Sequence, residues 1–239
     1  MELVFDKVTY TYPHRKQSAV NNISFTCPGG SICALIGPNG GGKSTVLQLA
    51  CGILKPDTGK LLCSEKPAYL PQQERIAYSF SVLEYVLFGR APSLKLFETP
   101  APSDEARAVQ CLNELGIEHL SYKRITELSG GELQLVRIAR VLVQDSSILL
   151  LDEPTDMLDP AHIATLITML KREKQQGSIV LMATHDLFIV QDYADYIIGI
   201  KSGIQFLCNA KAQCFTASNL EMLFDVSMMP REIFIPTIP

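Results

Sequence analysis

The sequence predicts an α/β fold with a mainly parallel β-sheet, and three apolar runs lead to this class. The first run, 32–36, enters a glycine-rich segment, 37–45, which a helical pattern follows. The second run begins after Ser147 and is apolar over 148–151, as expected for a parallel strand covered on both faces, and two carboxylates follow it. The third run, 179–183, is followed closely by a histidine. The polar residues are therefore expected together at the carboxyl edge of one sheet.

Residues 1–30 come before these runs and have a different pattern. Short apolar segments alternate with polar positions, and a turn is indicated at 28–30, which predicts antiparallel β-hairpins. After the glycine-rich segment, Val46, Leu49, Ala50 and Ile53 fall on one face of a helix. These patterns predict a small antiparallel β region in front of the parallel core.

The glycine-rich segment fits the pattern G-x-x-x-x-G-K-[ST], which binds phosphate groups. Glycines let backbone N–H groups turn toward phosphate oxygens, and the helix start adds partial positive charge. Lys43 would contact the β- and γ-phosphates, and the Ser44 hydroxyl would bind Mg²⁺. A structural turn is the alternative, but the strand before it and the helix after it favour a nucleoside triphosphate site. The candidate residues are Gly37, Pro38, Asn39, Gly40, Gly41, Gly42, Lys43, Ser44 and Thr45.

Two carboxylates end the second apolar run. Asp152 is expected beside the phosphate loop, where it would hold Mg²⁺ directly or through water. Glu153 would polarise the water that attacks the γ-phosphate. A strand followed by a solvated acidic turn is the structural alternative, and the loop upstream makes it the weaker one.

Residues 128–134 read Leu-Ser-Gly-Gly-Glu-Leu-Gln, a capped helix start whose hydroxyl and N–H groups can bind an anion. Alone, the segment could be an ordinary N-cap before a helix over 133–143. It also resembles the signature motif of ATP-binding cassette (ABC) ATPases, and this resemblance extends over essentially the whole chain. It implies that Ser129, Gly130 and Gly131 close on ATP held by the phosphate loop of a second subunit, in a head-to-tail homodimer.

Two further positions resemble family residues that contact the nucleotide. Tyr12 is similar to the aromatic residue that stacks on adenine, although a half-buried strand tyrosine is the structural alternative. Gln72 resembles the mobile glutamine that contacts Mg²⁺ and water and connects to the membrane partner. A plain loop amide, with Gln73 as a rival for the role, remains open.

Two more positions complete the resemblance. Asp159 resembles the aspartate that communicates between the two ATP sites, and before Pro160 it is also a good N-cap, so both readings can hold. His185 resembles the histidine that contacts the γ-phosphate, whereas a lone histidine is more often structural. The residues expected to be catalytic are therefore Glu153, His185 and Gln72, and those expected to hold Mg²⁺ are Ser44, Gln72 and Asp152.

The chain departs from the family pattern in two places. Gly41 stands where the family more often has alanine, serine or cysteine, which allows binding with a looser loop. Asp156 and Met157 replace a commoner small or polar pair, so a charge and a bulky side chain are expected at the dimer interface.

Net charge, cysteine content and the length of apolar runs argue against several classes of partner and site. A net charge of −4 over 239 residues, without a basic run, disfavours nucleic acid as a partner. The seven cysteines include no C-x-x-C pair and mostly have apolar neighbours, which indicates core thiols in a reducing compartment rather than a zinc site. A signal peptide and a membrane-spanning run are not expected.

The resemblance implies a single ABC ATPase domain over 1–239. An antiparallel β region is expected at about 1–30, and an inserted helical subdomain ending in the signature motif at about 73–135. The ATP-binding core is expected at about 31–72 and 147–227, and a C-terminal tail at about 228–239. Whether Ile233, Phe234 and Ile235 of the tail pack on the core is left open.

The segment 81–90 and the stand-alone cassette resemble ATPases of bacterial importers. The implied function is ATP-driven import of a metal ion or metal chelate, of the iron–siderophore, haem, cobalamin, zinc or manganese type. The implied partners are membrane permease subunits and, indirectly, a solute-binding protein, with the chain peripheral on the cytoplasmic face of the bacterial cell membrane. The alternative is a soluble ABC ATPase with an assembly role, such as iron–sulphur cluster assembly.

Overall fold

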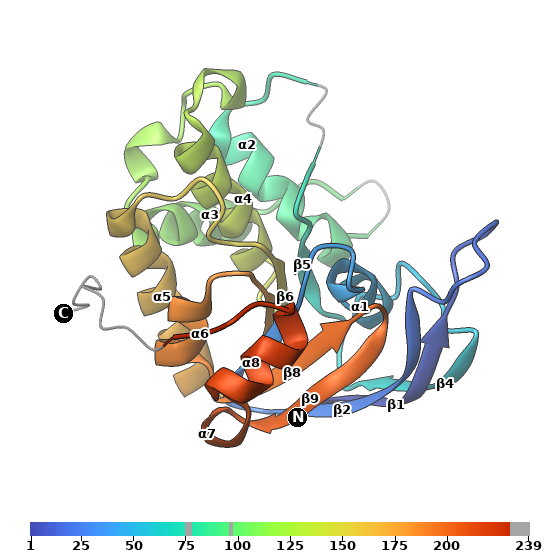
Figure 1. The fold of residues 1–239 in the computed structure, drawn as a ribbon. Coiled ribbons are helices and arrows are strands. Elements are labelled where there is room, and N and C mark those ends of the chain that lie inside the picture. The colour runs from blue at the N-terminus through green and yellow to red at the C-terminus, as the bar shows by residue number, and fades with distance from the viewer. Residues whose placement is uncertain (75–77, 96–97, 230–239) are drawn as a thin grey trace.

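The larger of two β-sheets forms the centre of the computed structural model, which describes residues 1–74, 78–95 and 98–229 (Figure 1). Its strands, from one edge to the other, are β5 (Ala68–Leu70), β6 (Ile148–Asp152), β7 (Ile179–Ala183), β3 (Ser31–Ile36), β8 (Tyr196–Lys201) and β9 (Ile204–Ala210). The five strands from β5 to β8 are parallel, and β9 runs antiparallel to β8. This confirms the predicted α/β class with a mainly parallel sheet. The tail residues Ile233, Phe234 and Ile235 lie outside the described residues.

The smaller sheet is antiparallel and contains β1 (Glu2–Tyr10), β2 (Val20–Pro28) and β4 (Thr58–Cys63). β1 lies in its centre, paired with β2 on one edge and with β4 on the other. The first two strands agree with the predicted hairpins. β4 differs, because the sequence interpretation assigned 31–72 to the core. Its pairing with β1 depends on contacts between distant parts of the chain, which local patterns do not reveal.

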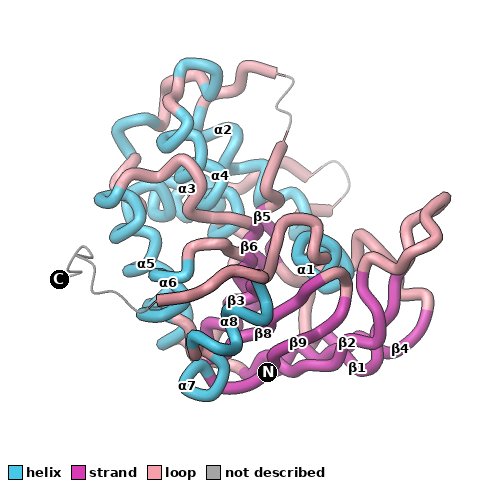
Figure 2. The backbone as a smooth tube through the Cα atoms, viewed as in Figure 1, coloured by secondary structure: helices cyan, strands magenta, loops and turns pink. Residues whose placement is uncertain are grey.

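Helices cover both faces of the larger sheet, and α2 (Val82–Leu87), α3 (Pro102–Glu114) and α4 (Gly130–Leu142) gather at one end of the molecule, far from the antiparallel strands (Figures 1 and 2). None in the described ranges is both long and apolar enough to cross a membrane. The α-helices are α1 (Lys43–Ala50), α2 (Val82–Leu87), α3 (Pro102–Glu114), α4 (Gly130–Leu142), α5 (Pro160–Gln175), α6 (Leu187–Tyr193), α7 (Lys211–Cys214) and α8 (Ala217–Phe224). Short 3₁₀ helices occupy Phe88–Ser93, Glu118–Leu120 and Ile125–Glu127.

The helix after the glycine-rich segment is shorter than its apolar pattern predicted. α1 ends at Ala50, so Ile53 does not share its apolar face and is 60% exposed. Gly52 follows the helix with a φ of 77°, a left-handed conformation that terminates helices. The expected membership of Ile53 in the helix face is therefore wrong, and the glycine is the reason.

The core has two main parts, one on each face of the larger sheet. Leu149 and Leu151 of β6 pack with α2, α3, α4 and α5. Their neighbours Ile148 and Leu150 pack on the other face, with α1 and the antiparallel sheet. Because β6 is buried along its whole length, its polar continuation emerges only at the carboxyl edge, where the site lies.

Candidate ATP-binding site

A cavity of about 620 Å³ lies at the carboxyl edge of the larger sheet. It brings together residues from the glycine-rich loop, from the end of β6, from the segment after β5 and from the loop after β1. The predicted site residues that line it are Tyr12, Asn39, Gly40, Gly42, Lys43, Ser44, Thr45, Gln72, Asp152 and Glu153. One cavity is thus lined by residues from segments that lie far apart in the sequence, from Tyr12 to Glu153.

At two positions of the glycine-rich loop, the surrounding backbone leaves no room for a side chain. Gly42 has a φ of 112° and precedes the first residue of α1, and an added Cβ would lie 2.6 Å from the Ala19 carbonyl oxygen. At Gly41 an added Cβ would lie 2.9 Å from the carbonyl oxygens of both Pro38 and Ile200. The close approach of these carbonyls gives a physical reason for glycine at position 41. The first N–H groups of α1 have no acceptor within the helix, so they are available to a phosphate.

Lys43 is buried between the loop and the two carboxylates. Its Nζ donates hydrogen bonds to the carbonyl oxygens of Gly37 at 2.8 Å and Pro38 at 3.3 Å. Burial lowers the pKa of Lys43, and the negative charges of Glu153 and Asp152 partly offset this effect. Gly37 and Pro38 therefore hold the ammonium group at the cavity rather than lining the cavity themselves.

Asp152 is 2% exposed and ends β6 beside α1. Burial raises the pKa of its carboxyl, while a hydrogen bond from Ser44 and the charge of Lys43 lower it. A carboxylate, the Ser44 hydroxyl and the Gln72 side chain thus face one cavity, and oxygen donors of this kind suit Mg²⁺.

Glu153 and His185 lie side by side because β6 and β7 are neighbouring parallel strands. The Glu153 Oε2 lies 2.9 Å from Nδ1 of His185 and accepts a hydrogen bond from the His185 backbone N–H at 3.2 Å. Glu153 is 4% exposed, and burial raises the pKa of its carboxyl, whereas the charge of His185 lowers it. His185 does not line the cavity itself, and it reaches the site through this carboxylate.

Gln72 is held by α4, the helix that begins within the signature segment. Arg137 of α4 donates hydrogen bonds to the backbone carbonyls of Pro71 and, at 3.5 Å, of Gln72. Gln134, one turn earlier on α4, donates to the carbonyls of Glu153 at 3.4 Å and Pro154 at 3.1 Å. One helix therefore fixes the backbone on two sides of the cavity.

Tyr12 lies two residues beyond the end of β1, not within the strand, and its hydroxyl is 3.2 Å from both Thr45 Oγ1 and Gln48 Oε1. The same loop contributes residues that the sequence interpretation missed: Arg15, Gln17, Ser18 and Ala19 also line the cavity. The polar run directly after Tyr12 was the available signal for them.

The signature segment lies elsewhere. Ser129 caps α4 as predicted: its Oγ accepts from the Glu132 N–H at 3.3 Å, and its own N–H donates to the Glu132 carboxylate at 2.8 Å. Ser129, Gly130 and Gly131 are not among the described residues that line the cavity of their own chain. An added Cβ at Gly130 would lie 2.9 Å from the Met157 sulfur, so Met157 packs over the helix start.

Asp159 is the N-cap of α5. Its Oδ1 accepts a hydrogen bond from the His162 N–H at 2.9 Å, and Pro160 takes the first helical position. The capping interpretation is confirmed. Asp159 is not among the described residues that line the cavity, so its expected role between two sites stays a prediction.

Comparisons with known proteins agree over this region. Residues 20–156 match the family model for ABC transporters. The chain is 36% identical to the chelated iron transport system membrane protein YfeB of Yersinia pestis, over 93% of this chain and 79% of that protein. The matched residues include the phosphate loop, the signature segment and both carboxylates.

Two solved structures are also similar. One is the inward-facing conformation of an ABC transporter assigned to the metal-chelate type, with a TM-score of 0.87 and 31% identity over 94% of this chain and 89% of that chain. The other is a dimeric post-hydrolysis state of the ATP-binding cassette MJ0796 bound to ADP and Pi. Its TM-score is 0.79 at 25% identity, over 87% of this chain and 98% of that chain.

Proposed function

The chain belongs to the ABC transporter family and is an ATPase, and from this premise we propose that it energises import of a metal ion or metal chelate through a separate membrane permease. Support for the solute class comes from the similarity to a chelated iron transport protein and to a metal-chelate type transporter. As the ATPase subunit it would bind the permease peripherally, at the cytoplasmic face of the cell membrane.

In the proposed mechanism the chain's own residues bind and orient ATP. Tyr12 stacks on the base, the loop N–H groups and Lys43 hold the β- and γ-phosphates, and Glu153 accepts a proton from the attacking water. His185 keeps the Glu153 carboxylate in place through the 2.9 Å contact and faces the γ-phosphate. The buried position of Glu153 supports this role, because a raised pKa brings a carboxylate closer to the value that suits a general base.

Mg²⁺ fits the same cavity. Ser44, Gln72 and Asp152 would hold it, since all three line the cavity and offer oxygen atoms. When bound, the ion would neutralise charge that develops on the phosphate oxygens.

A contact path between the cavity and an apolar groove is the single observation that carries the transport proposal. Two residues after Gln72, the Glu74 carboxylate accepts hydrogen bonds from the Tyr85 hydroxyl at 2.7 Å and from both terminal nitrogens of Arg140 at 2.7 Å. Tyr85 belongs to α2, and α2 with the 3₁₀ helix after it borders the groove. Movement of Gln72 would therefore reach the groove through Glu74 and the α2 residue Tyr85.

The groove has a volume of about 350 Å³ and is almost entirely apolar. It is lined by Phe80, Glu84, Leu87, Phe88, Ala91, Leu94 and Pro100. Phe88 is 47% exposed although Phe80 packs edge-on against it at 4.7 Å between ring centroids. We propose that a short amphipathic helix of the permease fills this groove, because its apolar lining and the exposed Phe88 ring favour burial against an apolar partner surface.

Glutamate at Phe88 is expected to weaken permease binding by about 10- to 150-fold, because burying a phenylalanine side chain contributes about 1.5–3 kcal/mol. ATP binding by the isolated chain should not change. The measurement is co-purification of the permease from solubilised membranes, together with nucleotide affinity. Tyr122→Glu is the matched control, since Tyr122 is 88% exposed and lies outside the groove. Equal permease recovery for both variants would contradict the docking site.

A head-to-tail homodimer follows from the position of the signature segment. We propose that Ser129, Gly130 and Gly131 bind the γ-phosphate of ATP held by a second copy, because they do not line the cavity of their own chain. The similarity to a dimeric cassette bound to ADP and Pi supports this arrangement. Asp159 would then lie between the two sites.

Arginine at Ser129 is expected to abolish hydrolysis and leave ATP affinity of the monomer unchanged, because the bulk would obstruct only the partner's site. Nucleotide titration and ATPase assays measure the two effects separately. Ser129→Asn is the control, since asparagine also caps helices and is much smaller. Loss of monomer ATP binding in Ser129→Arg would contradict the proposed dimer geometry.

The proposed function as a whole is tested by purifying tagged Glu153→Gln protein from gently solubilised membranes in the presence of Mg-ATP. Recovery of a polytopic permease with a solute-binding protein is expected and would identify the solute class. Recovery of soluble partners only would contradict transport and favour the assembly role.

A further inference from the structure

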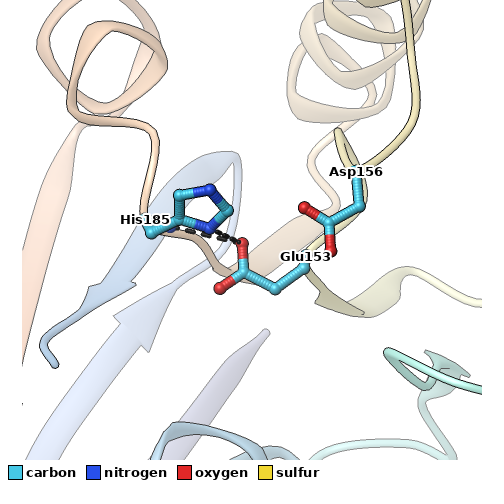
Figure 3. Close-up of side chains that lie close together, drawn as sticks. All are labelled: Glu153, Asp156 and His185. Carbon is cyan, nitrogen blue, oxygen red and sulfur yellow. Dashed lines mark hydrogen bonds and ion pairs between the residues drawn. The ribbon is translucent and has the colours of Figure 1, made fainter. Parts of the chain in front are cut away.

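Three side chains of types that can bind metal ions, Glu153, Asp156 and His185, lie close together (Figure 3). Glu153 follows β6, Asp156 lies in the turn after it, and His185 follows β7. One ligand atom from each residue lies within 4.8 Å of the others. The turn is fixed by a hydrogen bond from the Asp156 N–H to the Glu153 carbonyl at 3.2 Å.

The geometry of this trio suits a bound ion. Two ligands at about 2.1 Å from one metal lie about 3.0–3.4 Å apart in octahedral or tetrahedral coordination. Glu153 Oε2 and His185 Nδ1 are 2.9 Å apart, near that spacing already. The His185 side chain is 65% exposed, which leaves an open side for entry and for water ligands.

Charge also favours a cation here. Glu153 is 4% exposed and Asp156 is half-buried, so two acidic side chains approach one another where solvent has limited access. A divalent ion coordinated by both carboxylates and the imidazole would offset the repulsion between the two negative charges.

We propose that Glu153, Asp156 and His185 form a binding site for a divalent transition-metal ion, separate from the Mg²⁺ position at Ser44, Gln72 and Asp152. An imidazole nitrogen with two carboxylates suits Mn²⁺, Fe²⁺, Co²⁺ or Zn²⁺, whereas Mg²⁺ prefers oxygen donors alone. Asp156 is the residue that completes the trio, and it belongs to one of the two places at which this chain departs from the family pattern.

The consequence for activity rests on the proposed function. An ion at this site would occupy the Glu153 oxygen and the His185 nitrogen that hydrolysis requires. Hydrolysis would then slow when the ion accumulates on the side of the membrane that the importer delivers to. The site would give the importer a direct negative feedback by metal.

Binding is tested on the isolated, nucleotide-free chain with Co²⁺ in excess Mg²⁺. One Co²⁺ per chain is expected, with the d–d absorption of oxygen and nitrogen ligands. Asp156→Asn and His185→Ala should each weaken binding about 10-fold or more, because each removes a ligand. A Cys208→Ser background removes the exposed thiol, and a thiolate charge-transfer band would overturn the assignment. Displacement of Co²⁺ by Mg²⁺, or unchanged binding in both variants, would overturn it as well.

Regulation is tested by ATPase assays at saturating Mg-ATP with increasing Co²⁺. The original chain should be inhibited, and Asp156→Asn should keep the basal rate but need about 10-fold or more Co²⁺ for the same inhibition. Asp156→Ser serves as the second variant if asparagine destabilises the turn. Equal inhibition of all chains would overturn the feedback. These assays need no permease, so a failed permease capture would contradict the transport proposal and leave the metal site standing.

Discussion

Glutamine at Glu153 is expected to lower ATP hydrolysis by about 10²–10⁴-fold while ATP binding persists. The amide keeps the size of the side chain, but it cannot accept a proton from water. Glu153 is 4% exposed and directly contacts His185, so a solvent molecule cannot take the place of its carboxylate as the proton acceptor. Because closure around ATP no longer ends in hydrolysis, the variant should accumulate as an ATP-bound dimer, visible by size-exclusion chromatography with multi-angle light scattering.

Glu105→Gln is the matched control, because Glu105 is an exposed residue of α3 far from the cavity. It should hydrolyse ATP like the original chain and remain monomeric under the same conditions. A Glu153→Gln protein with normal turnover would refute the assignment of the general base. A variant that loses both turnover and ATP binding would indicate a structural role for the carboxylate.

The second large effect is expected from methionine at Lys43, which fills a similar volume without the charge. Loss of a hydrogen bond from a charged donor costs about 1.5–3 kcal/mol, so ATP affinity should fall about 10- to 150-fold. The same substitution should change AMP affinity only slightly, because Lys43 is expected to contact the β- and γ-phosphates, which AMP lacks. Titrations with ATP, ADP and AMP measure this dependence on phosphate number.

Two features make the Lys43 result interpretable. Methionine still packs in the buried position. The variant lacks the hydrogen bonds from Lys43 Nζ to the Gly37 and Pro38 carbonyls, and thermal unfolding measures the effect of that loss on stability separately. Lys55→Met, at an exposed site, controls for the change in net charge. Equal loss of ATP and AMP affinity would show that the substitution disrupts the loop rather than a phosphate contact.

The sequence predicted the parts of the site that depend on local pattern. The phosphate loop needs glycines and a lysine at fixed spacing, and β6 and β7 are continuous apolar runs, so their carboxyl ends were expected at one edge. The structure brings Lys43, Asp152 and Glu153 to one cavity there. The catalytic and metal-binding roles given to these residues remain predictions.

Features that depend on contacts between distant segments were not predictable in the same way. β4 joins β1 although nearly 50 residues separate the strands, and Arg15 lines the cavity in the loop after β1, which contacts α1 through the Tyr12 hydroxyl. Asp156 was noted as an unusual charge at a dimer interface. Its approach to His185 arises from the pairing of β6 with β7, which the pattern of either strand alone does not encode.

The α4 helix contacts the backbone on two sides of the cavity and also pairs with the Glu74 carboxylate. Local opening of this helix would release Arg137 from the carbonyls of Pro71 and Gln72, and at the same moment release Gln134 from those after β6. The segments around the nucleotide therefore form one cooperative unfolding unit with α4, instead of fraying independently. Amide protons in all of them should exchange with solvent at rates governed by a single opening equilibrium, and ATP would protect the whole unit by binding only its closed form.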